Sequence, residues 1–174
     1  MTKKQEDLLN SFLAGLGVED EPVYREIAMY LSGLGYEPRR VRSYIAFVHK
    51  SRGQQIAKMG YAWTKDHAPY FALKFSACEG YSRRFADAVG DYIAKNPTNL
   101  FPHCEDERCI YREDGERAPF YEIVTLEGET QACCGLKKIT IPHLAAGDVE
   151  ELKRIIREEH AYLIGNEAEA ADEA

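Results

Sequence analysis

The spacing of apolar residues changes along the chain, and this change limits the folds that the chain can adopt. Over residues 5–34 apolar side chains recur every three or four positions, which predicts two amphipathic helices. From residue 43 onward the pattern changes to a period of two residues, which predicts extended strands. The expected helices span 5–16 and 21–34, and the expected strands span 43–50, 54–64 and 70–78. Residues 54–62 also fit a short helix, because the run is brief and Gly60 interrupts it.

The second half of the chain continues this mixture. A helical pattern over 82–96 ends before Pro97, because proline disfavours helical geometry in the residue that precedes it. A hairpin is expected for 120–126 with 130–141, and a last amphipathic helix for 148–164. We therefore expect an α+β fold with N-terminal helices, a central mostly antiparallel sheet, and a C-terminal β-hairpin and helix.

The length of the chain fits one domain. Its 174 residues are 45% hydrophobic and 29% charged, close to the average of globular proteins. We expect residues 1–165 to form this domain, with a basic sheet segment at 39–84, a cysteine loop and hairpin at 97–142, and then a mobile acidic tail at 166–174. No apolar run approaches the roughly 20 residues of a membrane-spanning helix, and the first residues lack the apolar core of a secretory signal. These features favour a soluble cytoplasmic protein without a membrane partner.

Basic residues concentrate in one part of the chain although the net charge is −7. Residues 39–84 contain ten Lys and Arg against two acidic residues, whereas residues 85–174 contain nine against twenty. Such a segment favours a cationic surface for nucleic acid, phosphate or another anion. The alternative is that this segment pairs with the acidic C-terminal part inside one fold.

Aromatic residues are interleaved with the basic ones, as on sheet faces that stack bases and neutralise phosphates. We expect an anionic ligand to contact the following residues: Arg40, Arg42, Arg52, Lys58, Trp63, Lys65, Tyr70 and Lys74. The alternative is that Tyr61 and Trp63 belong to the core, because large aromatic side chains are usually buried.

The five cysteines suggest a second interpretation. An odd count without a secretory signal argues against a disulfide framework. Zinc takes four Cys or His ligands in a tetrahedron, and a metal could order a loop that has few apolar residues. The candidate ligands of a structural zinc are His103, Cys104, Cys109, Cys133 and Cys134. Buried inert thiols, or a redox pair or disulfide, are the alternatives.

The sequence contains no established catalytic motif. It lacks a phosphate-binding glycine loop, a G-x-G-x-x-G after a strand, an H-E-x-x-H and a G-x-S-x-G. Cys78 and His49 lie on neighbouring expected strands and would make a thiol–base pair if they met, but a small buried cysteine is the more common outcome. We therefore expect a noncatalytic binding or regulatory module for an anionic ligand, with a zinc- or thiol-dependent protein as the alternative.

A pattern spread over much of the chain resembles that of other proteins. Its parts are Leu73-x-Phe75-x-Ala77 before Tyr81-Ser82, then Cys104, Cys109 and Cys134-Gly135, then an extended segment at 139–142 and a helix that begins Asp148-Val149-Glu150. In this pattern the chain resembles a group of uncharacterised small bacterial proteins with a strand-to-helix segment and a cysteine loop. More distantly, the core of three strands and a helix resembles the MmcQ/YjbR-type α+β modules. The first resemblance implies a fold, and the second implies DNA binding, which has been proposed for those modules.

Overall fold

The computed structural model describes residues 1–63, 66–96, 119–124 and 128–165. Its helices are α1 (Lys3–Leu13), α2 (Asp20–Gly33), α3 (Arg83–Lys95) and α4 (Val149–Gly165), with a short 3₁₀ turn η3 (Ala146–Asp148) before α4. Its strands are β1 (Tyr36–Val41), β2 (Tyr44–His49), β3 (Gln55–Tyr61), β4 (Pro69–Leu73), β5 (Phe120–Val124), β6 (Thr130–Cys134) and β7 (Ile139–Ile141). The expected loop at 97–118 and tail at 166–174 lie outside the described residues.

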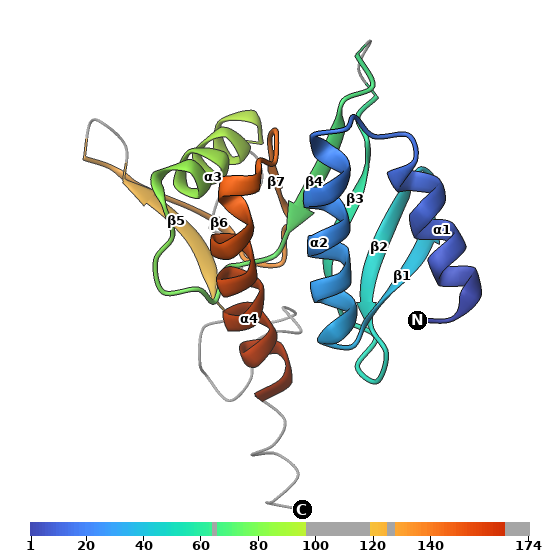
Figure 1. The fold of residues 1–174 in the computed structure, drawn as a ribbon. Coiled ribbons are helices and arrows are strands. Elements are labelled where there is room, and N and C mark those ends of the chain that lie inside the picture. Colours follow the sequence, from blue (N-terminus) through green and yellow to red (C-terminus); the bar gives the residue numbers. More distant parts are fainter. Residues whose placement is uncertain (64–65, 97–118, 125–127, 166–174) are drawn as a thin grey trace, which may run out of the picture.

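The larger sheet has five strands, and the smaller has two. The strand order of the larger sheet is β1-β2-β3-β4-β7, and each neighbouring pair runs antiparallel. Strands β5 and β6 form an antiparallel hairpin near α3 (Figure 1). The expected α+β fold with a mostly antiparallel central sheet and a C-terminal helix is therefore confirmed.

Short-range signals in the sequence set where the helices begin. At the start of α1 the Thr2 hydroxyl accepts a hydrogen bond from the Gln5 backbone N–H, and the Thr2 N–H donates to the Gln5 side chain at 2.7 Å. This reciprocal pair satisfies two N–H groups that a helix start otherwise leaves without partners. At the start of α2, Asp20 and Glu21 place negative charge where the helix dipole favours it.

Strand β1 was not expected from the sequence, because Pro38 was interpreted only as preventing the expected helix at 21–34 from continuing. The strand lies at the edge of the sheet and pairs only with β2 among the described strands, so the missing N–H of Pro38 does not interrupt a central ladder. Tyr36 and Pro38 are buried while Glu37 and Arg39 face outward, which is the alternation of a half-buried strand.

The expected long strand at 130–141 is instead two strands. Strand β6 pairs with β5, and β7 joins the larger sheet beside β4, with Leu73 opposite Ile139 and Phe71 opposite Ile141. A side chain at Gly135 would overlap the Pro119 carbonyl oxygen and Ser76, so the close approach at the break between the strands requires glycine.

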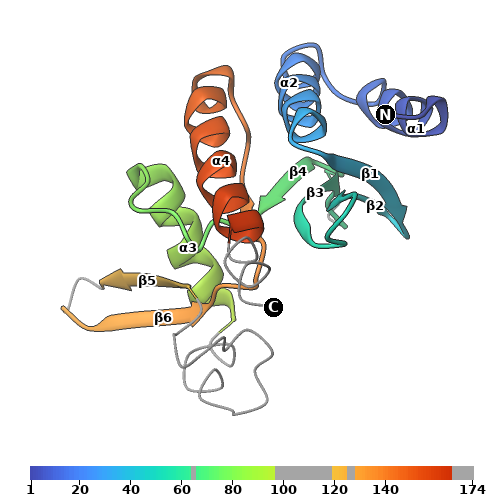
Figure 2. The same ribbon diagram turned by 90° about the horizontal axis from the view of Figure 1, so that it is seen from below.

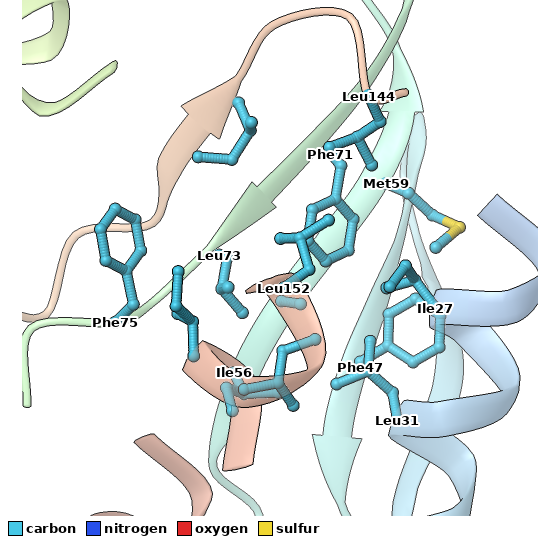
Figure 3. Close-up of a cluster of buried hydrophobic side chains, with 14 of the residues drawn as sticks. Ile27, Leu31, Phe47, Ile56, Met59, Phe71, Leu73, Phe75, Leu144 and Leu152 are labelled. Atoms are coloured by element: carbon cyan, nitrogen blue, oxygen red, sulfur yellow. The ribbon is translucent and has the colours of Figure 1, made fainter. Parts of the chain in front are cut away.

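Helices α1, α2 and α4 lie on one side of the five-stranded sheet, while α3 lies with β5 and β6 beside it (Figure 2). We call the side toward these helices the inner face. Its strand residues are Ile45, Phe47, Met59, Phe71 and Leu73, all of which are buried. They pack against helix residues such as Ile27, Leu31 and Leu152 (Figure 3). Burial of each large apolar side chain is worth about 1.5–3 kcal/mol, so this layer holds the helices on the sheet.

Each of the described helices is too short or too polar to cross a lipid bilayer.

Candidate anion-binding face

The side of the sheet turned away from α1, α2 and α4 carries some of the basic and aromatic side chains. The strand register places five residues in one row across this side: Arg39, Ala46, Lys58, Ala72 and Thr140. A second row contains Tyr44, Gly60 and Tyr70. We call these eight residues the outer face. Because alternate side chains of a strand point to opposite sides, the outer face is the reverse of the apolar inner face.

Lys58 lies between two tyrosines of the outer face. Its ammonium nitrogen is 5.4 Å from the centre of the Tyr44 ring and 5.9 Å from that of the Tyr70 ring. Gly60 separates the two tyrosines in the register, and a Cβ there would lie 3.1 Å from the Tyr44 Cβ. The glycine thus leaves the space between the rings to Lys58. A cation near aromatic rings at these distances is stabilised by about 0.5–1 kcal/mol in an exposed setting.

Further positive charge lies close to Lys58. The pKa of Lys138 is lowered, first by burial and then by the nearby charges of Lys58, Lys74 and Lys137. Lys138 immediately precedes β7 at the edge of the described sheet. Neither Lys58 nor Lys138 forms an ion pair with a carboxylate in the described part of the chain. An anion placed beside these lysines would reduce their mutual repulsion.

The structure brings together only some of the predicted ligand-binding residues. Lys58 and Tyr70 share the outer face. Arg40 lies opposite Ile45, which places it on the inner-face side of β1. Arg42 lies in the turn after β1 with a positive φ of 50°, Arg52 lies in the turn between β2 and β3, and Lys65 is outside the described residues.

Trp63 lies just beyond β3, and 89% of its surface is exposed. The alternative placement of Trp63 in the core is therefore wrong for this residue. Tyr61, by contrast, packs against the Phe12 ring with centroids 5.2 Å apart and donates a hydrogen bond to the Phe12 carbonyl. Trp63 therefore faces solvent, whereas Tyr61 packs against the core.

Lys74 requires a correction, because it does not supply surface charge. Only 7% of the residue is exposed, and its nitrogen lies 3.2 Å from Oε1 of the buried Glu159 in α4. The other oxygen of Glu159 accepts a hydrogen bond from the Ala77 N–H at 2.9 Å. The Lys74 ammonium also lies 5.7 Å from the centre of the Tyr162 ring. Lys74 is therefore neutralised inside the fold and is removed from the candidate site.

The alternative interpretation, internal pairing with the acidic C-terminal part, is confirmed for part of the basic segment, while anion binding stays a prediction. Lys74 pairs with Glu159, and Arg84 pairs with Asp148 at 3.0 Å, so part of the segment is neutralised by the acidic C-terminal region. Lys58 instead lies near the Tyr44 and Tyr70 rings and has no carboxylate partner among the described residues. The candidate site is therefore centred on Lys58 and its two tyrosines.

The expected zinc site lies mostly outside the described residues, which do not include His103, Cys104 or Cys109. Cys133 is buried and Cys134 is half-buried, and as neighbours on β6 they point to opposite sides of the strand. Over the described ranges, no group of three or more His, Cys, Asp and Glu side chains is arranged to hold a metal ion. Zinc binding stays a prediction, which metal analysis of the purified protein would test.

Cys78 and His49 are not arranged as a thiol–base pair. Cys78 packs on α4, where its Sγ donates to the Ile155 carbonyl at 3.3 Å. Burial, followed by the charges of Glu159 and Glu158, raises the pKa of the Cys78 thiol well above its usual range. The thiol is thus held in its protonated, weakly nucleophilic form.

His49 belongs to a ring cluster that sequence reasoning missed. Its ring centre lies 5.1 Å from that of Tyr36 and 5.9 Å from that of His160, and Ser51 shares a hydrogen bond with its Nδ1. His160 lies next to Glu159, which follows Leu152, Ile155 and Ile156 at helical spacing. Because of that spacing, the sequence alone could have predicted that Glu159 lies on the buried side of α4.

No family model, curated protein or solved structure matches this chain. The resemblances drawn from the sequence pattern therefore stay predictions, and the candidate site is assessed from its own residues.

Proposed function

We propose that this protein is a noncatalytic binding module whose anionic ligand, a nucleic acid or a phosphorylated small molecule, meets the outer face of the five-stranded sheet. The observation that carries the proposal is the position of Lys58 between the Tyr44 and Tyr70 rings. This arrangement offers one positive charge and two aromatic rings within one patch. Phosphate is attracted by the charge, and an unpaired base can stack on a ring.

Single-stranded nucleic acid is the form of ligand that this face favours. The small residues beside Lys58, namely Ala46, Gly60 and Ala72, are buried, so a ligand on the outer face would contact the half-buried Lys58, Tyr44 and Tyr70 side chains. A duplex hides the faces of its bases by stacking them, whereas a single strand can turn them toward aromatic side chains. Trp63 adds an exposed ring just past the end of β3.

Charge elsewhere on the molecule limits the expected affinity. The net charge of −7 repels a polyanion at long range, so attraction depends on the local cluster of Lys58, Lys138 and Arg39. Arg39 is itself partly neutralised by Glu37 at 3.3 Å. We expect binding that involves few phosphates and that weakens as salt is added, with a slope of about 0.7 per phosphate contact on a logarithmic plot.

The test is fluorescence anisotropy with a labelled single-stranded oligonucleotide, its duplex, and inorganic pyrophosphate as competitor. The expected result is salt-sensitive binding of the single strand that Lys58→Gln weakens. The matched control is Arg83→Gln, which removes a basic residue of the same segment whose side chain is 93% exposed on α3.

Three outcomes are distinguished by this design. Displacement by pyrophosphate at equal concentration would assign the site to a phosphorylated small molecule rather than a nucleic acid. Equal weakening by both substitutions would mean that only overall charge matters. Absence of salt-sensitive binding to every probe would contradict the proposal.

A further inference from the structure

A cavity of about 170 Å³ lies between α1 and the ends of β1, β2 and β3. Leu8, Phe12 and Met59 contribute apolar walls, and Ser11, Ser43 and Arg40 contribute polar groups. About half of the accessible lining is polar, so the cavity suits a ligand that has both an apolar and a polar part. Lys58 and Tyr70 do not line this cavity, although Tyr44 and Gly60 of the outer face do.

Arg40 is the charged residue of this cavity. It pairs in register with Ile45, so it lies on the side of β1 that faces α1, and it is exposed. Its neighbour Arg39 contacts the Glu37 carboxylate at 3.3 Å, but within the described residues Arg40 has no carboxylate partner. An unneutralised guanidinium at a cavity with both apolar and polar walls favours a ligand that joins an apolar body to an anionic group.

The other polar groups of the cavity differ in what they can offer. The Tyr61 hydroxyl already donates to the Phe12 carbonyl at 3.2 Å. The Ser11 and Ser43 hydroxyls form no hydrogen bond with another residue of the described part, so both can bind a ligand oxygen. A single cation and two hydroxyls match one carboxylate, because guanidinium and carboxylate can form two parallel hydrogen bonds.

The size of the cavity suits an apolar body of one ring. An apolar protein cavity of about 150 Å³ binds benzene, so about 170 Å³ accommodates a ring of that size. From the volume, the lining and the position of Arg40, we propose that this cavity is a binding site for a small monocyclic aryl carboxylate. The ring would contact Leu8 and Phe12, and the carboxylate would meet Arg40.

Titration with phenylacetate, followed by ¹H–¹⁵N correlation spectra of the full chain, tests this site. Phenylacetamide is the neutral comparison, because it keeps the ring and removes the charge. We expect phenylacetate to shift signals of residues in α1 and at the ends of β1 to β3, and to bind about tenfold more tightly than phenylacetamide.

Two substitutions examine the charge separately from the neighbouring surface. Arg40→Gln should abolish the preference for the charged probe, whereas Arg39→Gln, one residue away on the opposite side of β1, should leave it unchanged. Both arginines are exposed, so neither change removes a core contact. A third variant, Ser11→Leu, narrows the cavity from α1 and should weaken both probes.

Equal binding of the two probes, or equal loss in the Arg40 and Arg39 variants, would overturn the carboxylate assignment. Signal changes confined to other parts of the chain would overturn the location. Oligonucleotide binding at the outer face is tested separately through Lys58→Gln, because Lys58 does not line this cavity, whereas Tyr44 borders both regions and is left unchanged.

Discussion

Lys58 and Lys74 lie on or beside neighbouring strands of one sheet but meet different surroundings. Lys74 is 7% exposed and lies 3.2 Å from the Glu159 carboxylate, so its charge is neutralised within the fold. Lys58 is half-buried and lies near two tyrosine rings, which attract a cation without cancelling its charge. The comparison indicates that lysines of one basic segment can have different roles. A lysine that pairs with a buried carboxylate stabilises the fold, whereas a lysine near aromatic rings keeps a charge that a ligand can meet.

The largest expected effect comes from removing the partner of Lys74. Glu159→Ala leaves a buried ammonium without a carboxylate and the Ala77 N–H without its acceptor. We expect the free energy of unfolding to fall by about 3–5 kcal/mol, as measured by urea denaturation. The double substitution Lys74→Met with Glu159→Leu should recover most of this loss. A loss below about 1 kcal/mol in Glu159→Ala would mean that Lys74 reaches solvent.

Alkaline pH should destabilise the fold through Cys78, which packs on the same helix as Glu159. Its folded pKa is raised by burial, so the unfolded chain loses the thiol proton first as pH rises. Stability is therefore full below the ordinary thiol pKa and declines above it. We expect Cys78 to account for about 1 kcal/mol of loss at pH 10, since it is only half-buried. Denaturation of Cys78→Ala at pH 7.5 and 10, compared with the unsubstituted chain, checks this. Identical pH dependence in both would contradict it.

Lys58→Gln should affect binding more than folding. We expect affinity for a single-stranded oligonucleotide to fall about fivefold, equivalent to ~1 kcal/mol. The free energy of unfolding should change by less than about 1 kcal/mol, because the cation–ring contact is partly exposed. Anisotropy and urea denaturation on the same variant separate the two effects. If stability falls strongly while binding is retained, Lys58 has a structural role like that of Lys74.

Trp63→Ala should give the smallest effect. The side chain lies beyond the end of β3 and is 89% exposed, so its removal should leave stability unchanged and weaken binding about twofold. Because Trp63 is the only tryptophan of the chain, quenching of its fluorescence by an unlabelled oligonucleotide provides an independent measurement. Emission unaffected by saturating oligonucleotide would place Trp63 outside the site.

The local spacing of apolar residues predicted most helices and strands. It did not predict which strands pair when they are far apart in the sequence. The helical spacing and the alternation in the central part gave α1, α2, β2 and β3 within a few residues of their observed bounds. The pattern contains no information on which strand lies at the edge of the sheet. A proline is tolerated mainly in an edge strand, so β1 with Pro38 was not predicted. Nor does the pattern reveal that β7 leaves the 130–141 hairpin to pair with β4.

The candidate site was predicted in part for the same reason. Alternation correctly separates Phe71 from Tyr70, but it cannot tell which helix covers a residue once the strand has ended. Strand β4 ends at Leu73, and Lys74 is then reached by Glu159 of α4. Arg40 illustrates a second limit, because its side of β1 depends on a register with β2 that the unexpected strand concealed.

The pairing of β4 with β7 has a consequence for how the protein folds during synthesis. The first four strands and the helices α1 and α2 emerge well before residues 139–165, which supply the fifth strand and the helix that contacts Lys74 and Cys78. Until those residues appear, β4 has an open edge, and the apolar side chains that α4 later buries face water. Since contacts between distant segments slow folding, the early part of the chain exposes an aggregation-prone edge for as long as its last strand is missing.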